Sequence, residues 1–206
     1  MPTEAIVSPR VKEKRQRRRA EIQEAALRAF REKGYHATTL DDIAERLGIR
    51  NTALYHYFPD KESILYACHR ESLAEVDRLL EEAEQRFDSA PEQLAHVIRE
   101  HVRVMTDTLL GSPLAFEVSA LTPRHQSTVI AARDRYERAV RRIVERGQRA
   151  GLLKPIDPKI AVFAILGAIN WIARWYKPDG TIHTDTLGEA FADHLVGGLI
   201  CRPPRP

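Results

Sequence analysis

Apolar residues recur along this chain with the period of α-helices. From Leu40 to Leu47 they follow the i, i+3, i+4, i+7 spacing of a helix face that packs against a core. Similar patterns, interrupted by Gly and Pro, continue to Leu199, and no two alternating segments are joined as a β-hairpin would be. The pattern therefore predicts an all-α fold.

Two short helices separated by a glycine are predicted within residues 38–61. The first begins at Thr38 or Thr39, whose hydroxyl can accept an exposed backbone N–H, and it ends at Gly48. The second, at about residues 50–57, is too short and too polar to be a core element. A short helix held by a capped partner is the helix-turn-helix arrangement, which places side chains in the DNA major groove. This segment predicts DNA binding.

Longer helices are predicted in the rest of the chain, over residues 60–87, 94–110, 123–150, 158–176 and 184–199, with a short apolar segment at 114–121. The helix at 158–176 is apolar nearly all round, which predicts burial on every side. One chain offers too little apolar surface to cover both faces of this helix. A second copy of the chain is therefore expected to cover the other face.

Positive charge is concentrated at the N-terminus. Residues 1–20 contain seven Lys or Arg against two Glu, whereas the whole chain has a net charge of only +3. Residues 1–9 are expected to be a disordered tail. Arg15 to Arg19 are candidates for contacts with DNA phosphates or an adjacent minor groove, and a solvated segment is the alternative.

The chemistry-bearing residues do not predict an enzyme or a metal protein. Cys68 and Cys201 lack metal-ligand spacing, and the sequence contains no G-x-S-x-G, H-E-x-x-H or Gly-rich phosphate loop. Four histidines stand singly and are expected to be ordinary surface or core residues: His101, His125, His183 and His194. No catalytic residue, metal or cofactor is predicted.

The expected cellular location rests on the lack of a signal peptide and of a membrane-spanning segment in the sequence. The N-terminus lacks the apolar core of a signal peptide, and the longest apolar run, Ile160 to Ile169, is too short to span a bilayer. The protein is expected in the bacterial cytoplasm, associated with the nucleoid, with no membrane partner.

The segment from Arg19 to Leu65 resembles the DNA-binding domain of the TetR family of bacterial transcriptional regulators. The matching pieces are AEIQEAALRAF, KGYHATTL, DDIAERLGI, NTALYHYF and PDKESIL. The resemblance implies a basic arm at residues 1–18, a three-helix DNA-binding domain at 19–65, and a larger helical ligand-binding and dimerisation domain at 66–206. It also implies a homodimer, formed by the last two helices of each subunit, that binds a palindromic operator.

By position in the family motif, Arg50, Asn51 and Thr52 open the recognition helix and are candidates for base contacts. Arg matches the acceptors of guanine, and Asn matches adenine. Many family members have Lys in place of Asn51 and Gly in place of Thr52, so the operator of a relative cannot be transferred to this chain.

The other implied DNA contacts are to phosphates or thymine methyl groups, and they involve Thr39, Tyr55, His56, Tyr57 and Lys61. For Tyr57, core packing beneath the helix is the alternative. Leu54 and Phe58 are predicted to pack in that core.

A small-molecule cavity in the second domain is also implied. The segment GAINWIARWYKPDG resembles a pattern in family members that respond to acyl-CoA thioesters. Asn170 and Arg174 lie i, i+4, and a buried pair of this kind needs a partner such as a phosphate, an adenine or a thioester carbonyl. The alternative is that Arg174 pairs with a carboxylate across the dimer interface. The candidate effector-binding residues are Met105, Phe116, Arg133, Asn170, Trp171, Arg174 and Trp175.

Arginines on the helix at 123–150 are further candidates. Arg124, Arg133 and Arg141 could meet CoA phosphates, and a solvated helix face is the alternative.

The sequence thus predicts a transcriptional regulator, expected to be a repressor that a hydrophobic effector such as an acyl-CoA releases from DNA. One alternative is a TetR-type regulator of drug efflux that responds to apolar or cationic compounds. Another is a TetR-fold protein that organises DNA without an inducer. An activator is a third alternative, because the sign of regulation depends on where the operator lies relative to the promoter.

Overall fold

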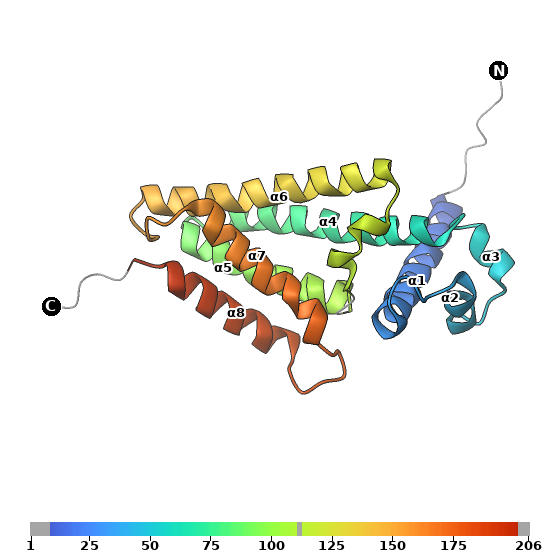
Figure 1. Cartoon of the computed structure of the whole chain (residues 1–206). Helices are drawn as coiled ribbons and strands as arrows, with labels where there is room; N and C mark the ends of the chain where they lie inside the picture. Colours follow the sequence, from blue (N-terminus) through green and yellow to red (C-terminus); the bar gives the residue numbers. More distant parts are fainter. Residues whose placement is uncertain (1–8, 111–112, 202–206) are drawn as a thin grey trace, which may run out of the picture.

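The computed structural model describes residues 9–110 and 113–201. Over these residues the chain forms eight α-helices and no strand, which confirms the predicted all-α fold. The helices are α1 (Pro9–Lys33), α2 (Leu40–Arg46), α3 (Asn51–Tyr55), α4 (Lys61–Arg86), α5 (Ala90–Arg103), α6 (Pro123–Arg149), α7 (Pro158–Trp175) and α8 (Thr184–Leu199). In Figure 1, α1, α2 and α3 lie at one end of an elongated molecule, and α4 runs from that end into the larger helical part.

α1 begins earlier than the sequence suggested. It starts at Pro9, inside the segment assigned to the basic arm at residues 1–18. Proline is favourable at the first helical position, and the Lys, Arg, Gln and Glu residues that follow are good helix formers. The disordered tail expected for residues 1–9 lies outside the described residues except for Pro9, which is helical.

The helix-turn-helix forms as predicted, and its boundaries are set by local groups. Thr39 caps α2: its hydroxyl accepts the N–H of Asp42 at 3.1 Å, and the Asp42 carboxylate accepts the N–H of Thr39 at 2.7 Å. Gly48, after α2, has a φ of +62°, which favours glycine. α3 is a single turn, shorter than the expected 50–57, and Leu54 and Phe58 hold it against the core, as predicted.

The N-terminal turns of α6 are attached to the first turns of α4. The N–H of Thr122 donates to the Glu62 carboxylate at 2.8 Å, and Nδ1 of His125 lies 2.8 Å from the same group. The ring of Tyr66 stacks on His125 with 3.7 Å between centroids. Because Glu62 follows Lys61, the first residue of α4, this junction lies directly beside the DNA-binding helices.

The predicted helix at 94–110 is divided in the structure. α5 ends at Arg103 and continues as a π-helical turn, Val104–Thr108, in which the Thr106 hydroxyl donates to the Val102 carbonyl at 3.1 Å. Leu110 then has a φ of 52°. The apolar segment at 114–121 forms two short 3-10 turns, Pro113–Phe116 and Val118–Ala120.

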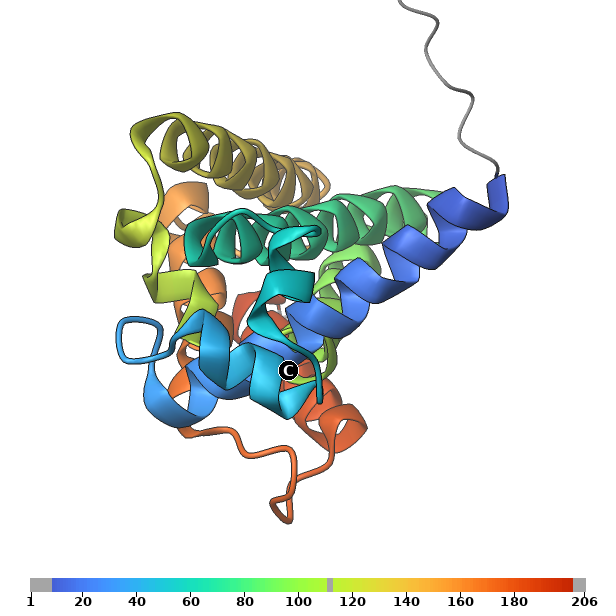
Figure 2. The ribbon, with the colours of Figure 1, turned by 90° about the vertical axis from the view of Figure 1, so that its right-hand side faces the viewer.

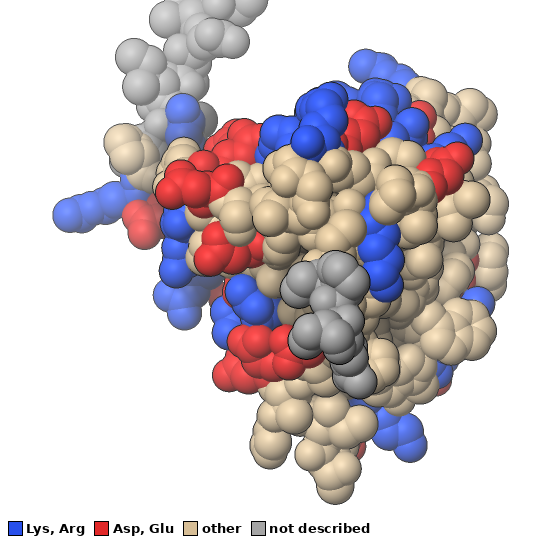
Figure 3. Space-filling model, turned by 90° about the vertical axis from the view of Figure 1, so that its left-hand side faces the viewer, with Lys and Arg blue, Asp and Glu red and all other residues tan. Residues whose placement is uncertain are grey.

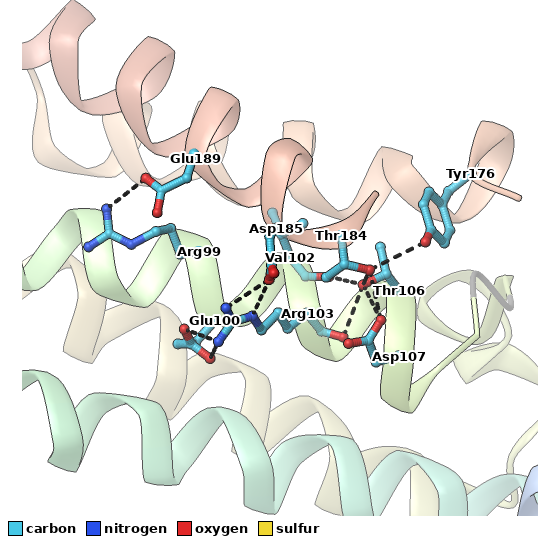
Figure 4. Close-up of polar contacts among 10 residues, drawn as sticks. All are labelled: Arg99, Glu100, Val102, Arg103, Thr106, Asp107, Tyr176, Thr184, Asp185 and Glu189. Carbon is cyan, nitrogen blue, oxygen red and sulfur yellow. Dashed lines mark hydrogen bonds and ion pairs between the residues drawn. The ribbon is translucent and has the colours of Figure 1, made fainter. Parts of the chain in front are cut away.

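α8 packs along α5 and is held there by polar contacts (Figure 4). Arg103 donates to Asp185 at 2.8 Å, and the Thr184 hydroxyl donates to Asp107 at 2.8 Å. Gly188 lies against the backbone of Arg99, where an added Cβ would be 3.4 Å from the carbonyl oxygen. These contacts fix the first turns of α8 to the end of α5 and to the π-helical turn.

One face of α7 remains uncovered within a single chain. The side chains of Ile160, Phe163, Trp171 and Trp175 are 66%, 55%, 58% and 40% exposed. Burial on every side is therefore not achieved by one copy, in agreement with the expectation that a second copy covers this face. Figure 3 views the end of the molecule opposite the helix-turn-helix and shows a broad area largely free of Lys, Arg, Asp and Glu. No helix in the described ranges is long and apolar enough to cross a membrane.

Candidate functional site

The exposed side of α3 presents four of the predicted DNA-contacting residues to solvent. Arg50, Thr52, Tyr55 and His56 are exposed, and Tyr55 reaches 52%. Leu54, on the opposite side of the same turn, is fully buried. The helix therefore directs a cation, a hydroxyl and two aromatic rings outward from a fixed apolar anchor.

Asn51 and Thr39 lie at the junction of α2 and α3, and both are hydrogen-bonded within the protein. Nδ2 of Asn51 donates to the Asp41 carboxylate at 2.5 Å, and its Oδ1 is buried with no hydrogen-bond partner among residues 9–110 and 113–201. The Thr39 hydroxyl donates to Asp42 at 2.7 Å. Lys33 and then Thr39 hold the pKa of Asp42 well below its usual range, so this cap is ionised at neutral pH.

The side chain of Lys61 is directed into the protein. Its ammonium donates to the carbonyls of Tyr35, His36 and Thr38 at 2.7, 3.2 and 2.6 Å. A lysine ammonium has three donors, so all of them are used. In this structure the Lys61 side chain holds the loop before α2, and the exposed cation nearest to α3 is Arg50.

Tyr57 follows α3 and connects it to α1. Its side chain is half-buried, and its carbonyl accepts Nη1 of Arg19 at 2.5 Å. The Arg19 guanidinium also lies 3.9 Å from the centroid of the Phe58 ring. α1 is therefore fixed beside the C-terminal end of the recognition helix.

A cavity of about 120 Å³ lies in the larger part of the molecule. We name it the α4–α7 cavity. Its lining comes from four α-helices, the π-helical turn and the segment after it, and consists of His69, Ser72, Leu73, Val76, His101, Met105, Leu109, Leu114, Arg133, Tyr136, Leu166 and Asn170. Half of these twelve side chains are apolar, and the polar ones converge from α4, α5, α6 and α7.

The polar residues of the cavity differ in charge and in hydrogen bonding. The Tyr136 hydroxyl and Nδ1 of His101 are 3.0 Å apart, and burial lowers the pKa of His101 to about 4. Burial, and then the charge of Arg133, lower the pKa of His69 to about 3. Both imidazoles are consequently neutral at pH 7, which leaves Arg133 as the charged side chain of the lining.

His69 also carries an unsatisfied polar atom. Its side chain is 2% exposed, and Nε2 has no hydrogen-bond partner within the described residues. A neutral imidazole nitrogen is either a donor or an acceptor, according to the tautomer. The cavity thus offers one neutral hydrogen-bonding nitrogen and one guanidinium beside an apolar surface.

The predicted effector-binding residues fall into two groups. Met105, Arg133 and Asn170 line the α4–α7 cavity. Outside it lie Phe116, Trp171, Arg174 and Trp175, which are all exposed. Asn170 and Arg174 do not form a buried pair within one chain: Arg174 lies near the end of α7, exposed, with its guanidinium 4.5 Å from the centroid of the Phe116 ring.

The arginines proposed for CoA phosphates also lie in different surroundings. Arg133 faces the cavity, whereas Arg141 forms an ion pair with Glu137 on the same helix, as expected for a solvated face.

Nine of the twelve lining residues were not predicted from the sequence, and they include His69, His101 and Tyr136. For His69 a signal was present, because it precedes Leu73 and Val76 by four and seven residues on the apolar face of α4. Among the residues described, no group of three or more His, Cys, Asp or Glu could hold a metal ion.

Comparisons with known proteins agree with this geometry. Residues 22–68 match the family model described as "Bacterial regulatory proteins, tetR family", and residues 87–199 match "Tetracyclin repressor-like, C-terminal domain". The HTH-type transcriptional repressor KstR2 of Mycobacterium tuberculosis is 26% identical over 195 residues, covering 88% of this chain and 92% of the relative.

Two solved structures are also similar. The regulator PfmR from Thermus thermophilus has 32% sequence identity and a TM-score of 0.77, covering 85% of this chain and 97% of that one. AibR in complex with isovaleryl coenzyme A and operator DNA has 25% identity and a TM-score of 0.73, covering 89% and 98%. Regulators of this kind bind operator DNA, and dimerisation is typical of them. The chain belongs to the TetR family of bacterial regulatory proteins and is a DNA-binding transcriptional regulator rather than an enzyme.

Proposed function

We propose that a small effector releases this repressor from a palindromic operator by binding in the α4–α7 cavity, and that acyl-CoA thioesters are the leading effector class. The observation that carries the proposal is that Arg133 and His69 both line the cavity beside apolar side chains. We also propose that the protein acts in the bacterial cytoplasm on the nucleoid and needs no cofactor besides its effector.

Arg133 and His69 favour an effector with a carbonyl or carboxylate oxygen. A guanidinium attracts an electron-rich oxygen, and Nε2 of His69 can donate to that oxygen in one tautomer. A buried polar atom left without a partner costs free energy, so an effector that provides one is favoured over a purely apolar ligand. The charge of Arg133 also disfavours a cationic compound, which argues against the efflux-type alternative with cationic drugs.

The size of the cavity favours a compact acyl group. At about 120 Å³ it is slightly smaller than a cavity of roughly 150 Å³ that binds benzene. A branched or short chain of a few carbons fits this volume, whereas a long chain requires the surrounding helices to move. The isovaleryl coenzyme A bound by AibR, a similar structure, has an acyl group of this compact type.

The cavity is physically connected to the DNA-binding helices in two places. Met105 and Leu109 line it from the segment that ends at Leu110, whose carbonyl accepts Nη1 of Arg31 on α1 at 3.4 Å. Arg133 lies on α6, whose first turns are attached to α4 through Glu62. An effector that binds better to a conformation in which these connections shift would, by linkage, weaken DNA binding.

Isothermal titration tests the effector class directly. The protein is titrated with CoA esters of acyl length C4 to C16, with the free acids, and with CoA alone. We expect the short esters to bind, and Arg133→Met to reduce their affinity at least tenfold, while Arg141→Met on the same helix leaves it unchanged. Binding that survives in Arg133→Met and is lost in Arg174→Ala would move the effector from the cavity to the outer side of α7. No binding of any ester would refute the effector class.

A further inference from the structure

The N-terminal turns of α1 extend beyond the helix-turn-helix. Arg19 is the point at which α1 meets the end of α3, and residues 9–18 precede it in an unbroken helix. At 1.5 Å per residue this segment is about 15 Å long. Figure 2 shows it reaching past the other helices at the edge of the molecule.

This extension carries a large excess of positive charge, with Glu13 as the single acidic residue in residues 9–19. Arg17 and Arg18 are partly neutralised, because both pair with Glu21. The other cations are Arg10, Lys12, Lys14 and Arg15, which are exposed and make no hydrogen bond or ion pair with the described part of the chain. Four uncompensated cations on a rigid helix form a surface suited to a polyanion.

The orientation of the extension is fixed by Arg19. Its guanidinium binds the carbonyl of Tyr57 and lies over the Phe58 ring, so this side of α1 faces the C-terminal end of α3. With 3.6 residues per turn, Arg15 and Lys12 lie within about 40° of Arg19 around the helix axis. Burial and then the charge of Arg15 lower the pKa of Arg19, as expected for two cations on one side.

Arg10 and Lys14 lie on the other side of the same helix. They are about 140–180° from Arg19 around the axis. The pair Lys12 and Arg15 and the pair Arg10 and Lys14 therefore have equal charge and a similar distance from the helix-turn-helix, and all four side chains are exposed. The two pairs differ in the direction they face.

We infer that Lys12 and Arg15 bind backbone phosphates of the operator outside the base pairs that α3 contacts. On their side of α1, Arg19 binds the carbonyl of Tyr57, which follows the exposed Tyr55 and His56 at the end of the recognition helix. Sugar–phosphate backbone at the edge of the major groove passes that end of a recognition helix, and its charge is complementary to the two cations. The operator footprint of each subunit is accordingly longer than its helix-turn-helix alone requires.

The salt dependence of binding tests this inference. Each phosphate contact contributes about 0.9 to the slope of log K against log salt, so Lys12→Gln/Arg15→Gln should reduce the slope by about 1.8 per subunit bound. At 0.15 M salt the same relation gives roughly a 30-fold loss of affinity per subunit, for operator and random DNA alike. The control, Arg10→Gln/Lys14→Gln, removes the same charge and should leave the slope within error of the wild type. Circular dichroism verifies that both variants keep the helix.

Duplex length provides a second readout. Lengthening the operator by about five base pairs on each side should increase the affinity of the wild type and of the control, but not of Lys12→Gln/Arg15→Gln. Equal slope changes in both double variants would show a non-directional effect of charge and overturn the inference. No slope change in either would show that the extension is an ordinary solvated helix.

Discussion

Replacement of His69 by leucine is expected to raise stability and remove function. Nε2 of His69 is buried and has no hydrogen-bond partner in the described part of the chain, and a group of this kind costs about 1–3 kcal/mol in the folded state. Leucine has a similar size and no polar atom, so the free energy of unfolding should rise by about that amount. For a chain of this length each kcal/mol raises Tm by roughly 2–4 °C, which gives an increase of about 2–12 °C.

The matched control is His101→Leu. His101 is equally buried, but its Nδ1 lies 3.0 Å from the Tyr136 hydroxyl, so leucine leaves that hydroxyl unpaired. We expect this variant to lose about 1–3 kcal/mol. Both are measured by thermal unfolding at one fixed protein concentration, because the Tm of a dimer depends on concentration.

Operator binding and the response to acyl-CoA esters are measured with the same variants. His69→Leu should bind operator DNA as the wild type does and should no longer respond to acyl-CoA esters. A His69→Leu protein that is destabilised as much as His101→Leu would show that His69 serves the folded structure. A full effector response in His69→Leu would remove His69 from the effector site.

Three further predictions concern pH, DNA and assembly. The pKa values of His101 and His69 are lowered to about 4 and about 3 from 6.5, so below pH 6.5 the unfolded chain binds protons that the folded chain does not. The free energy of unfolding should therefore fall between pH 6.5 and 4 by up to about 1.4 kcal/mol per pH unit for each histidine. Urea denaturation at several pH values should show that the free energy of unfolding of His69→Leu changes less with pH than that of the wild type. An equal change with pH in both proteins would contradict this. Tyr55→Ala should weaken binding to operator and random DNA alike, whereas replacing the exposed Arg50 by Ala should relax preference at one base pair by about 1–3 kcal/mol in competition assays, and equal losses in both would contradict these separate roles. Trp171→Glu should yield monomers in sedimentation equilibrium, because it places a charge on the exposed face of α7, and a retained dimer would exclude that face as the interface.

Helix boundaries were predictable because local groups set them. The Thr39 cap and the Gly48 turn depend on residues within a few positions, and both form as predicted. The division of the helix at 94–110 depends on the hydroxyl of Thr106 in a buried setting, which the apolar pattern does not encode.

The residues of the cavity were harder to predict than the helices that carry them. Asn170 and Arg174 share a side of α7 by spacing, yet only Asn170 reaches the cavity, since Arg174 lies beyond its end. His69 and Arg133 meet from α4 and α6, and their proximity depends on how two distant helices pack. A single sequence specifies the face of each helix but not which residues of another helix lie opposite.

The central claim is that occupation of the α4–α7 cavity releases the operator. The most direct measurement is the affinity of the wild type and of Arg133→Met for a selected palindrome, at fixed salt, with and without short-chain acyl-CoA esters. We expect an ester to weaken wild-type binding at least tenfold and to leave Arg133→Met on the operator. Specific binding of the wild type that no ester changes, or release of both proteins to the same extent, would contradict it.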